Sequence, residues 1–226
     1  VGSGGWGTAL SLRLLANGHD VVLWSYHDAE REVLETTRIN PLLPGVSLPA
    51  ELRLTSSAEA AEDAEMVVFA TPSFAVRTTA KTFAPYLRAG ALVVSVTKGI
   101  EDGTGCRMSQ IITQETGKPV VALSGPSHAE EVSRGLPTGV VAACEDRLLA
   151  ERVQSAFMSD CLRVYTCPDV IGVELGAAHK NVIALCAGIC DGMGYGDNTK
   201  ALLMTRGLAE VARLGMAMGA KRETFA

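Results

Sequence analysis

The chain begins Val1-Gly2-Ser3-Gly4-Gly5-Trp6-Gly7 and continues Thr8-Ala9-Leu10-Ser11-Leu12. The first stretch has the spacing G-x-G-x-x-G, and the second is an apolar helical pattern. Backbone N–H groups at such a loop-to-helix junction hold a pyrophosphate, and the helix dipole favours the anion there. The first glycine allows a tight turn, the second lets backbone approach the phosphates, and the third lets the helix pack on the sheet. The spacing predicts a dinucleotide-binding loop with Gly2, Gly4 and Gly7 at its glycine positions.

This fingerprint requires a β-strand in front of it, and only Val1 precedes the loop. We therefore expect that most of the first strand is missing from the chain. A glycine-rich turn without a ligand is the alternative interpretation. The apolar helical pattern and the strand that follow the loop favour one βαβ unit instead.

Strands and helical stretches alternate through the first two thirds of the chain. Continuous apolar runs of this kind are typical of parallel strands covered on both faces. The alternation predicts an α/β fold with a doubly wound, Rossmann-type parallel sheet. The expected strands are 20–24, 66–70, 91–97 and 120–124, and the runs 138–144 and 162–166 would extend the same sheet.

After Pro168 the pattern becomes entirely helical, with helices expected over 170–190 and 198–218 and a Gly-rich break between them. We expect a dinucleotide-binding domain over residues 1–168 and the start of a helical substrate or dimerisation domain over 169–226. Two helices alone have too little partner surface to bury their apolar faces. The second domain is therefore expected to be incomplete, and a second subunit in a homodimer is one way to cover it.

Composition narrows the class of protein. The 226 residues carry a net charge of −5 with 47% hydrophobic residues, which indicates a compact fold and disfavours nucleic acid as a partner. The six cysteines have no C-x-x-C or zinc-type spacing, so we expect reduced thiols, no metal site and a cytoplasmic location. No unbroken apolar run reaches the ~18 residues of a membrane span, and no signal peptide is evident.

The end of the second strand bears on the choice of cofactor. A ribose-binding acid is expected there, about 20 residues after the glycine loop. This sequence has Ser25-Tyr26-His27-Asp28, with the acid only near the expected place. NAD and NADP therefore both stay open. Tyr26 is a candidate for packing on the adenine and His27 for holding a phosphate, and two surface residues are the alternative.

Further segments, taken in series, resemble the bacterial type of NAD(P)-dependent glycerol-3-phosphate dehydrogenase over essentially the whole chain. They are Thr97-Lys98-Gly99-Ile100-Glu101, Ser124-Gly125-Pro126-Ser127, His179-Lys180-Asn181-Val182-Ile183-Ala184 and Thr205-Arg206-Gly207-Leu208-Ala209-Glu210. The resemblance implies reversible hydride transfer between NAD(P)H and dihydroxyacetone phosphate. This reaction gives sn-glycerol 3-phosphate for phospholipid biosynthesis.

The resemblance also implies roles for single residues. Lys180 matches the catalytic proton acceptor and a substrate contact, and Lys98 matches a lysine that touches both cofactor and substrate. The other matched positions are substrate contacts at Gly125 and Ser127 and cofactor contacts at Gly5, Trp6, Tyr26 and Ala129, with His27 beside them. Lysine suits acid–base work if burial or a neighbouring cation lowers its pKa, and Lys98 is a candidate for that cation.

The family continues beyond Ala226 into segments that bind substrate and cofactor, so we expect this chain to be truncated and inactive on its own. Two other functions stay open. One is another hydroxyacid-type dehydrogenase with the same architecture, and the other is a non-catalytic NAD(P)-binding module. The module would have no need for two lysines at a cleft.

Overall fold

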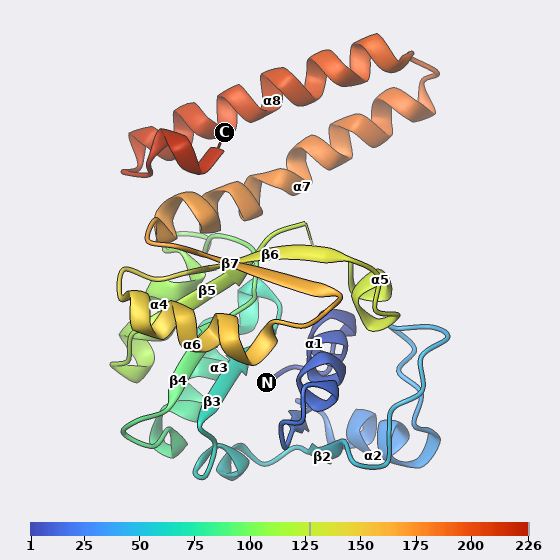
Figure 1. Ribbon diagram of the computed structural model, residues 1–226, viewed down its shortest axis with the longest axis vertical. Coiled ribbons are helices and arrows are strands. Elements are labelled where there is room, and N and C mark those ends of the chain that lie inside the picture. Colours follow the sequence, from blue (N-terminus) through green and yellow to red (C-terminus); the bar gives the residue numbers. More distant parts are fainter. Residues whose placement is uncertain (127, 226) are drawn as a thin grey trace.

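The computed structural model describes residues 1–126 and 128–225, and it has the alternating α/β order expected from the sequence (Figure 1). Within the described residues, a two-stranded sheet has the order β1-β2 and a five-stranded sheet has the order β3-β4-β5-β6-β7. The strands are β1 (Val22–Trp24), β2 (Arg53–Thr55), β3 (Met66–Phe69), β4 (Leu92–Ser95), β5 (Val120–Ser124), β6 (Thr138–Ala143) and β7 (Leu162–Cys167). The helices are α1 (Gly5–Ala16), α2 (Asp28–Thr37), α3 (Val76–Phe83), α4 (Met108–Thr116), α5 (Ala129–Ser133), α6 (Arg147–Phe157), α7 (Val170–Gly192) and α8 (Asp197–Ala217).

Residues 1–2 connect the two sheets. The backbone nitrogen of Val1 donates to the Val68 carbonyl at 2.8 Å, and the Ala70 N–H donates to the Val1 carbonyl at 2.8 Å. The Gly2 N–H donates to the Trp24 carbonyl at 3.0 Å. These residues thus lie between β1 and β3, in the place where the glycine-loop fingerprint requires a strand.

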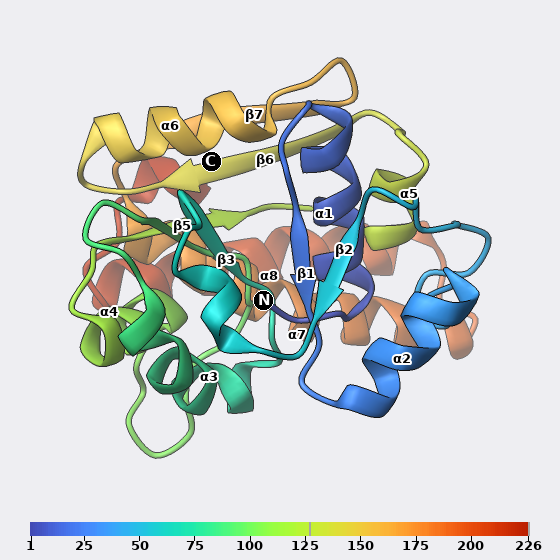
Figure 2. The same ribbon diagram turned by 90° about the horizontal axis from the view of Figure 1, so that it is seen from below.

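Helices cover both faces of the central strands, as a doubly wound sheet requires (Figure 2). Phe83 of α3 and Ile111 of α4 are buried with Phe69 in one apolar cluster. Leu10 of α1 and Phe157 of α6 belong to a second cluster on the sheet. Fully burying a side chain of this size contributes about 1.5–3 kcal/mol. The expected fold class is therefore confirmed.

The direction of β6 differs from the expected parallel sheet. β3, β4 and β5 are parallel, but β6 is antiparallel to β5, and β7 is parallel to β6. A parallel return requires a crossover that packs on the sheet. The helix in the described part of the segment between β5 and β6 is the short α5, which packs on α1, so the chain turns back along β5 instead of crossing over.

The last two long helices form a hairpin beside the sheet (Figure 1). Asp169 caps α7, because its Oδ1 accepts a hydrogen bond from the Gly172 N–H at 2.9 Å. Its Oδ2 accepts from the Lys221 N–H at 2.8 Å and the Thr224 hydroxyl at 2.6 Å, which ties the start of α7 to the segment after α8. The last strand ends at Cys167 and α7 begins at Val170.

The sequence led us to expect no membrane-spanning stretch, and one helix bears on this expectation by length and composition. In the described part of the chain, the 23-residue helix α7 is long and apolar enough to cross a membrane by length and composition alone, with a mean hydropathy of 1.3 over an 18-residue window. The expectation counted unbroken apolar runs, whereas the valine, isoleucine, leucine and alanine residues of α7 keep its average hydropathy high although polar residues interrupt them. The core helix of a soluble protein passes the same test. α7 also carries the buried Glu174 and the exposed Lys180.

Candidate active site

The glycine loop packs closely at two of its glycines and is open at the third. Gly2 has φ +108°, and a Cβ there would lie 2.9 Å from the Ala70 carbonyl oxygen. A Cβ on Gly7 would lie 2.0 Å from the Gly2 carbonyl oxygen, so only glycine lets α1 approach the strand. A Cβ on Gly4 would meet nothing within 4 Å. The first and third glycines are therefore needed for packing, while the second faces open space where a phosphate can approach.

The first turn of α1 is suited to an anion. Gly4 is the N-cap residue and offers no side-chain acceptor, and the first turn contains no acidic residue. The N–H groups and the positive end of the helix dipole therefore face no protein carboxylate from α1 itself. The residues present fit the diphosphate of a dinucleotide.

Ala129 lies beside this turn. A Cβ built on Gly5 would be 3.7 Å from the Ala129 Cβ and 2.7 Å from the Leu42 carbonyl oxygen. α5 packs on α1, which brings Ala129 to Gly5 across more than 120 residues of sequence. Two residues expected to touch the cofactor are thus neighbours.

Asn40 braces the glycine loop, and the sequence patterns missed it. Its side chain is 1% exposed, and Nδ2 donates to the Ser3 carbonyl at 2.8 Å and to the Thr8 hydroxyl at 2.7 Å. Its Oδ1 accepts from the Leu42 N–H at 2.9 Å. A lone asparagine in an irregular segment carries no spacing signal, so only the fold identifies this contact.

Glu30 is a second residue that the sequence patterns missed. Its carboxylate accepts hydrogen bonds from the hydroxyls of Ser3 at 3.0 Å and Ser25 at 2.8 Å. An acid near the end of β1 is thus present in the first turn of α2, with its carboxylate bonded to the glycine loop and to Ser25. The distance from the loop was the only signal, and it pointed to Asp28, which bonds to Ser56 instead.

Tyr26 and His27 lie at the end of β1. The Tyr26 ring packs edge-on against Trp24 at 6.0 Å and against His27 at 4.7 Å between centroids. Tyr26 is 74% exposed, and His27 is the exposed N-cap residue of α2. Both side chains are accessible to a ligand, and their cofactor roles stay a prediction.

Lys98 follows β4 on a loop that is held from both sides. The Thr97 hydroxyl donates to the Thr71 carbonyl at 2.7 Å. Gly99 has φ +142°, and a Cβ there would lie 2.8 Å from the Ser73 Cβ. On the other side, Arg77 binds both carboxylate oxygens of Glu101, with Nε and Nη2 at 2.7 and 2.6 Å. This loop therefore presents Lys98 in a defined place.

The structure places Lys98 and Lys180 near enough for their charges to interact. The Lys98 ammonium lies 5.8 Å from the centroid of the Trp6 ring, at the start of α1. Burial lowers the pKa of Lys98, and the nearby charge of Lys180 lowers it further. Lys180 itself is exposed on α7. Two lysines 82 positions apart in the sequence thus share one electrostatic environment beside the glycine loop.

Gly125 directly follows β5 in a conformation that requires glycine. Its φ is +153°, and a Cβ would lie 3.0 Å from the Gly139 carbonyl oxygen and 3.1 Å from the Val140 Cα. Ser127, the other expected substrate contact from this turn, lies outside the described residues. No group of three or more His, Cys, Asp or Glu side chains suited to a metal occurs in the described part of the chain.

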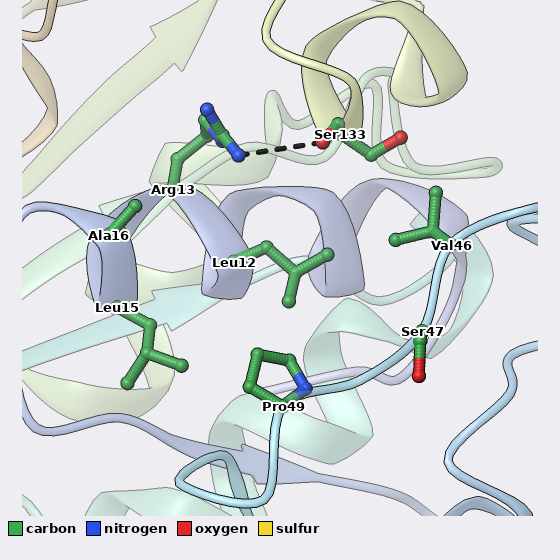
Figure 3. A pocket seen from close by; sticks show the side chains of 8 residues that line it. All are labelled: Leu12, Arg13, Leu15, Ala16, Val46, Ser47, Pro49 and Ser133. Atoms are coloured by element: carbon green, nitrogen blue, oxygen red, sulfur yellow. Dashed lines mark hydrogen bonds between the residues drawn. The ribbon is translucent and has the colours of Figure 1, made fainter.

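A cavity of about 310 Å³ lies elsewhere, along the second half of α1 (Figure 3). In Figure 3 the side chain of Arg13 donates to the Ser133 carbonyl on one wall, and Leu12 and Pro49 form the opposite part of the lining. None of the expected site residues lines this cavity. The candidate active site is instead the region between the glycine loop, Lys98 and Lys180.

Two family models cover most of the chain. Residues 1–150 match the N-terminal model of NAD-dependent glycerol-3-phosphate dehydrogenase, and residues 169–226 match the C-terminal model. The chain belongs to the NAD-dependent glycerol-3-phosphate dehydrogenase family. The resemblance seen in the sequence motifs is thereby confirmed.

Individual members of the family agree with this assignment. The chain is 52% identical over 227 residues to a glycerol-3-phosphate dehydrogenase [NAD(P)+] of Desulfitobacterium hafniense, and 52% identical over 232 residues to that of Pelotomaculum thermopropionicum. All of this chain is covered in both comparisons, but it spans only 64% and 66% of the two relatives. The crystal structure of the Coxiella burnetii family member has a TM-score of 0.93 at 34% identity, covering 99% of this chain and 69% of that one.

The same fold occurs in proteins outside the family. A ketopantoate reductase from Ralstonia eutropha aligns with a TM-score of 0.67 at 18% identity, covering 97% of this chain and 74% of that one. This likeness concerns the fold alone.

Proposed function

We propose that the protein is an oxidoreductase that transfers a hydride between NAD(P)H and dihydroxyacetone phosphate, giving sn-glycerol 3-phosphate for glycerophospholipid synthesis. The observation that carries this proposal is that two positively charged lysines, Lys98 and Lys180, influence each other next to the glycine loop. A dinucleotide site alone serves many functions, but two cations beside it suit a phosphorylated substrate whose oxygen gains negative charge.

In this proposal the cofactor is NAD or NADP, which supplies or accepts the hydride when bound. Gly2, Gly4 and Gly7 give the diphosphate room and hydrogen-bond donors at the start of α1. The other proposed cofactor contacts are Gly5, Trp6, Tyr26, His27, Lys98 and Ala129. The closeness of Ala129 to Gly5 supports this grouping.

Lys180 is the proposed catalytic residue. Reduction of the ketone builds negative charge on its oxygen, and the Lys180 ammonium donates a proton to that oxygen. In the reverse direction the Lys180 amine accepts the proton from the alcohol. Lys98, whose pKa is lowered, would supply a second positive charge at the site. It would bind and orient the substrate together with Gly125 and Ser127.

We also propose the division into a dinucleotide-binding unit, residues 1–168, and a helical unit from residue 169, with the site where they meet. A homodimer would cover part of the apolar surface of α7 and α8, where Leu185, Ile189 and Leu202 are more than half exposed. A cytoplasmic location is supported by the six free cysteines.

The test is a substrate panel on the full-length protein. NADH or NADPH absorbance is followed with dihydroxyacetone phosphate, a 2-keto acid and a 3-keto acid. The proposal expects oxidation of the cofactor with dihydroxyacetone phosphate and much slower turnover of both acids. Preference for an acid would favour another hydroxyacid-type dehydrogenase. Cofactor binding without turnover of any of the three would favour a non-catalytic module.

A further inference from the structure

Glu174 is a buried acid on α7 that the proposed chemistry does not use. Its side chain is 6% exposed. It forms an ion pair with Arg107, which is itself only 13% exposed. The Ser109 N–H donates to Oε1 at 2.8 Å and the Ser109 hydroxyl donates to Oε2 at 2.6 Å. Both carboxylate oxygens are therefore bound to the start of α4.

The start of α4 suits this acid. Arg107 is the N-cap residue, and Ser109 lies in the first turn, where N–H groups have no partner within the helix. A negative charge at this end is favoured by the helix dipole. Since both partners are largely buried, the pair holds one geometry better than a surface ion pair would.

Glu174 binds Arg107 and Ser109, which lie where the loop that carries Lys98, residues 96–107, meets α4. Ile100 and Arg107 form an antiparallel bridge, and the Glu101 N–H donates to the Cys106 carbonyl at 2.9 Å. The loop between Lys98 and α4 is thus closed on itself and is further held by the pairing of Glu101 with Arg77. A displacement at Arg107 would be carried to Lys98 through these bonds.

The helix that carries Glu174, α7, also carries Lys180. Glu174 precedes Lys180 by six residues on one continuous helix, a rise of about 9 Å. The buried residues of α7 lie in its first turns and its far half is largely exposed, so its direction depends on the anchored first turns. Rotation or sliding of α7 at Glu174 would move Lys180 relative to Lys98.

We propose that Glu174 is a positioning residue of the reaction: by joining α7 to the Lys98 loop through Arg107 and Ser109, it sets the relative placement of Lys180 and Lys98. This inference rests on the proposed function, since it concerns the productive geometry of the two lysines. Misplacing a reacting group by about 1 Å costs on the order of 100-fold in rate.

The experiment compares Glu174→Gln and Glu174→Ala with Glu151→Ala in the full-length protein. Glutamine keeps an acceptor for Ser109 but loses the charge that faces Arg107, whereas alanine loses both. Glu151 pairs with Arg147 on the surface of α6 and controls for the loss of an ordinary ion pair. The readouts are kcat with dihydroxyacetone phosphate, the Kd of the cofactor, and the folded fraction at the assay temperature.

We expect kcat to fall on the order of 10- to 100-fold in Glu174→Ala, with partial rescue in Glu174→Gln and an unchanged cofactor Kd. Unchanged kcat in both variants would overturn the inference. A loss of kcat that merely follows the folded fraction, or that comes with an equal loss of cofactor binding, would also overturn it and leave a structural role. If the wild-type protein does not reduce dihydroxyacetone phosphate at all, the proposed function fails instead.

Discussion

The ammonium group of Lys98 lies over the indole ring of Trp6, 5.8 Å from its centroid. This contact links the loop after β4 to the first turn of α1, so the candidate substrate lysine and the glycine loop are held together before any ligand binds. A cation over an aromatic face contributes about 0.5–1 kcal/mol at an exposed site and more when it is desolvated. The partial burial of Lys98 places it between these cases.

Replacing Trp6 tests this contact. Trp6→Leu removes the aromatic face, and we expect KM for dihydroxyacetone phosphate to rise about threefold, in line with a loss of ~0.7 kcal/mol. Trp6→Phe keeps a ring and should retain most of the effect. Steady-state kinetics at saturating cofactor measures both variants. Equal KM values for Leu and Phe would show that the aromatic face does not hold Lys98.

Removing the charge of Lys180 is expected to raise the pKa of Lys98. A like charge disfavours the protonated form, so Lys180→Met should move this pKa up toward its ordinary value, and burial should keep it below that value. NMR titration of the Lys98 side chain measures the change. Lys200→Met is the control, because Lys200 pairs with Asp191 on the helical hairpin. A Lys98 pKa that is the same in Lys180→Met and the wild type would contradict the shared environment.

Alanine substitutions at two glycines of the loop are expected to have different effects, one on stability and the other on cofactor binding. Gly7→Ala forces a Cβ to 2.0 Å from the Gly2 carbonyl oxygen, so we expect a loss of stability of about 3 kcal/mol. Gly4→Ala meets no protein atom within 4 Å and should fold normally while its cofactor Kd rises. Thermal unfolding and cofactor titration distinguish the two outcomes.

Gly188→Ala is the matched control for Gly7→Ala and Gly4→Ala. Gly188 lies inside α7 with nothing near its Cβ position, so alanine should be neutral or stabilising there. Normal cofactor binding by Gly4→Ala would mean that no phosphate approaches this position.

The pairing of Glu101 with Arg77 predicts an acid dependence of stability. Hydrogen bonds from Arg77 and Thr104 lower the pKa of Glu101 to about 2, from 4.5. A lowered folded-state pKa adds stability above the unfolded pKa, and this stability is lost as pH falls through the folded pKa. We therefore expect Glu101→Gln to reduce the loss of stability between about pH 4.5 and about pH 2. Denaturant titrations across this range provide the measurement, and identical slopes for wild type and variant would contradict it.

The sequence predicted the elements well because their signals are local. Glycine spacing located the start of α1, and apolar runs located β3, β4 and β5. The direction of β6 was not predictable in this way, because it depends on where α5 packs. Antiparallel and parallel strands have the same apolar runs when both faces are covered.

The site was predictable only in part for the same reason. Lys98 and Lys180 stood out through family motifs. The effect of the Lys180 charge on the pKa of Lys98 was not predictable, because it depends on how α7 packs near the end of the sheet. Asn40, Glu30 and Glu174 act through contacts between residues 27 to 67 positions apart in the sequence. The separation is 27 for Glu30 and Ser3, 32 for Asn40 and Thr8, and 67 for Glu174 and Arg107. No periodicity or spacing rule reports such pairs.

The most direct test of the account is the kcat of Lys180→Ala in the full-length protein, with NADH or NADPH and dihydroxyacetone phosphate at saturation. Loss of the proton donor is expected to lower kcat by a factor on the order of 100 to 10,000, while the Kd of the cofactor stays at the wild-type value. A kcat near that of the wild type would contradict the central claim that Lys180, set beside Lys98, carries the proton transfer.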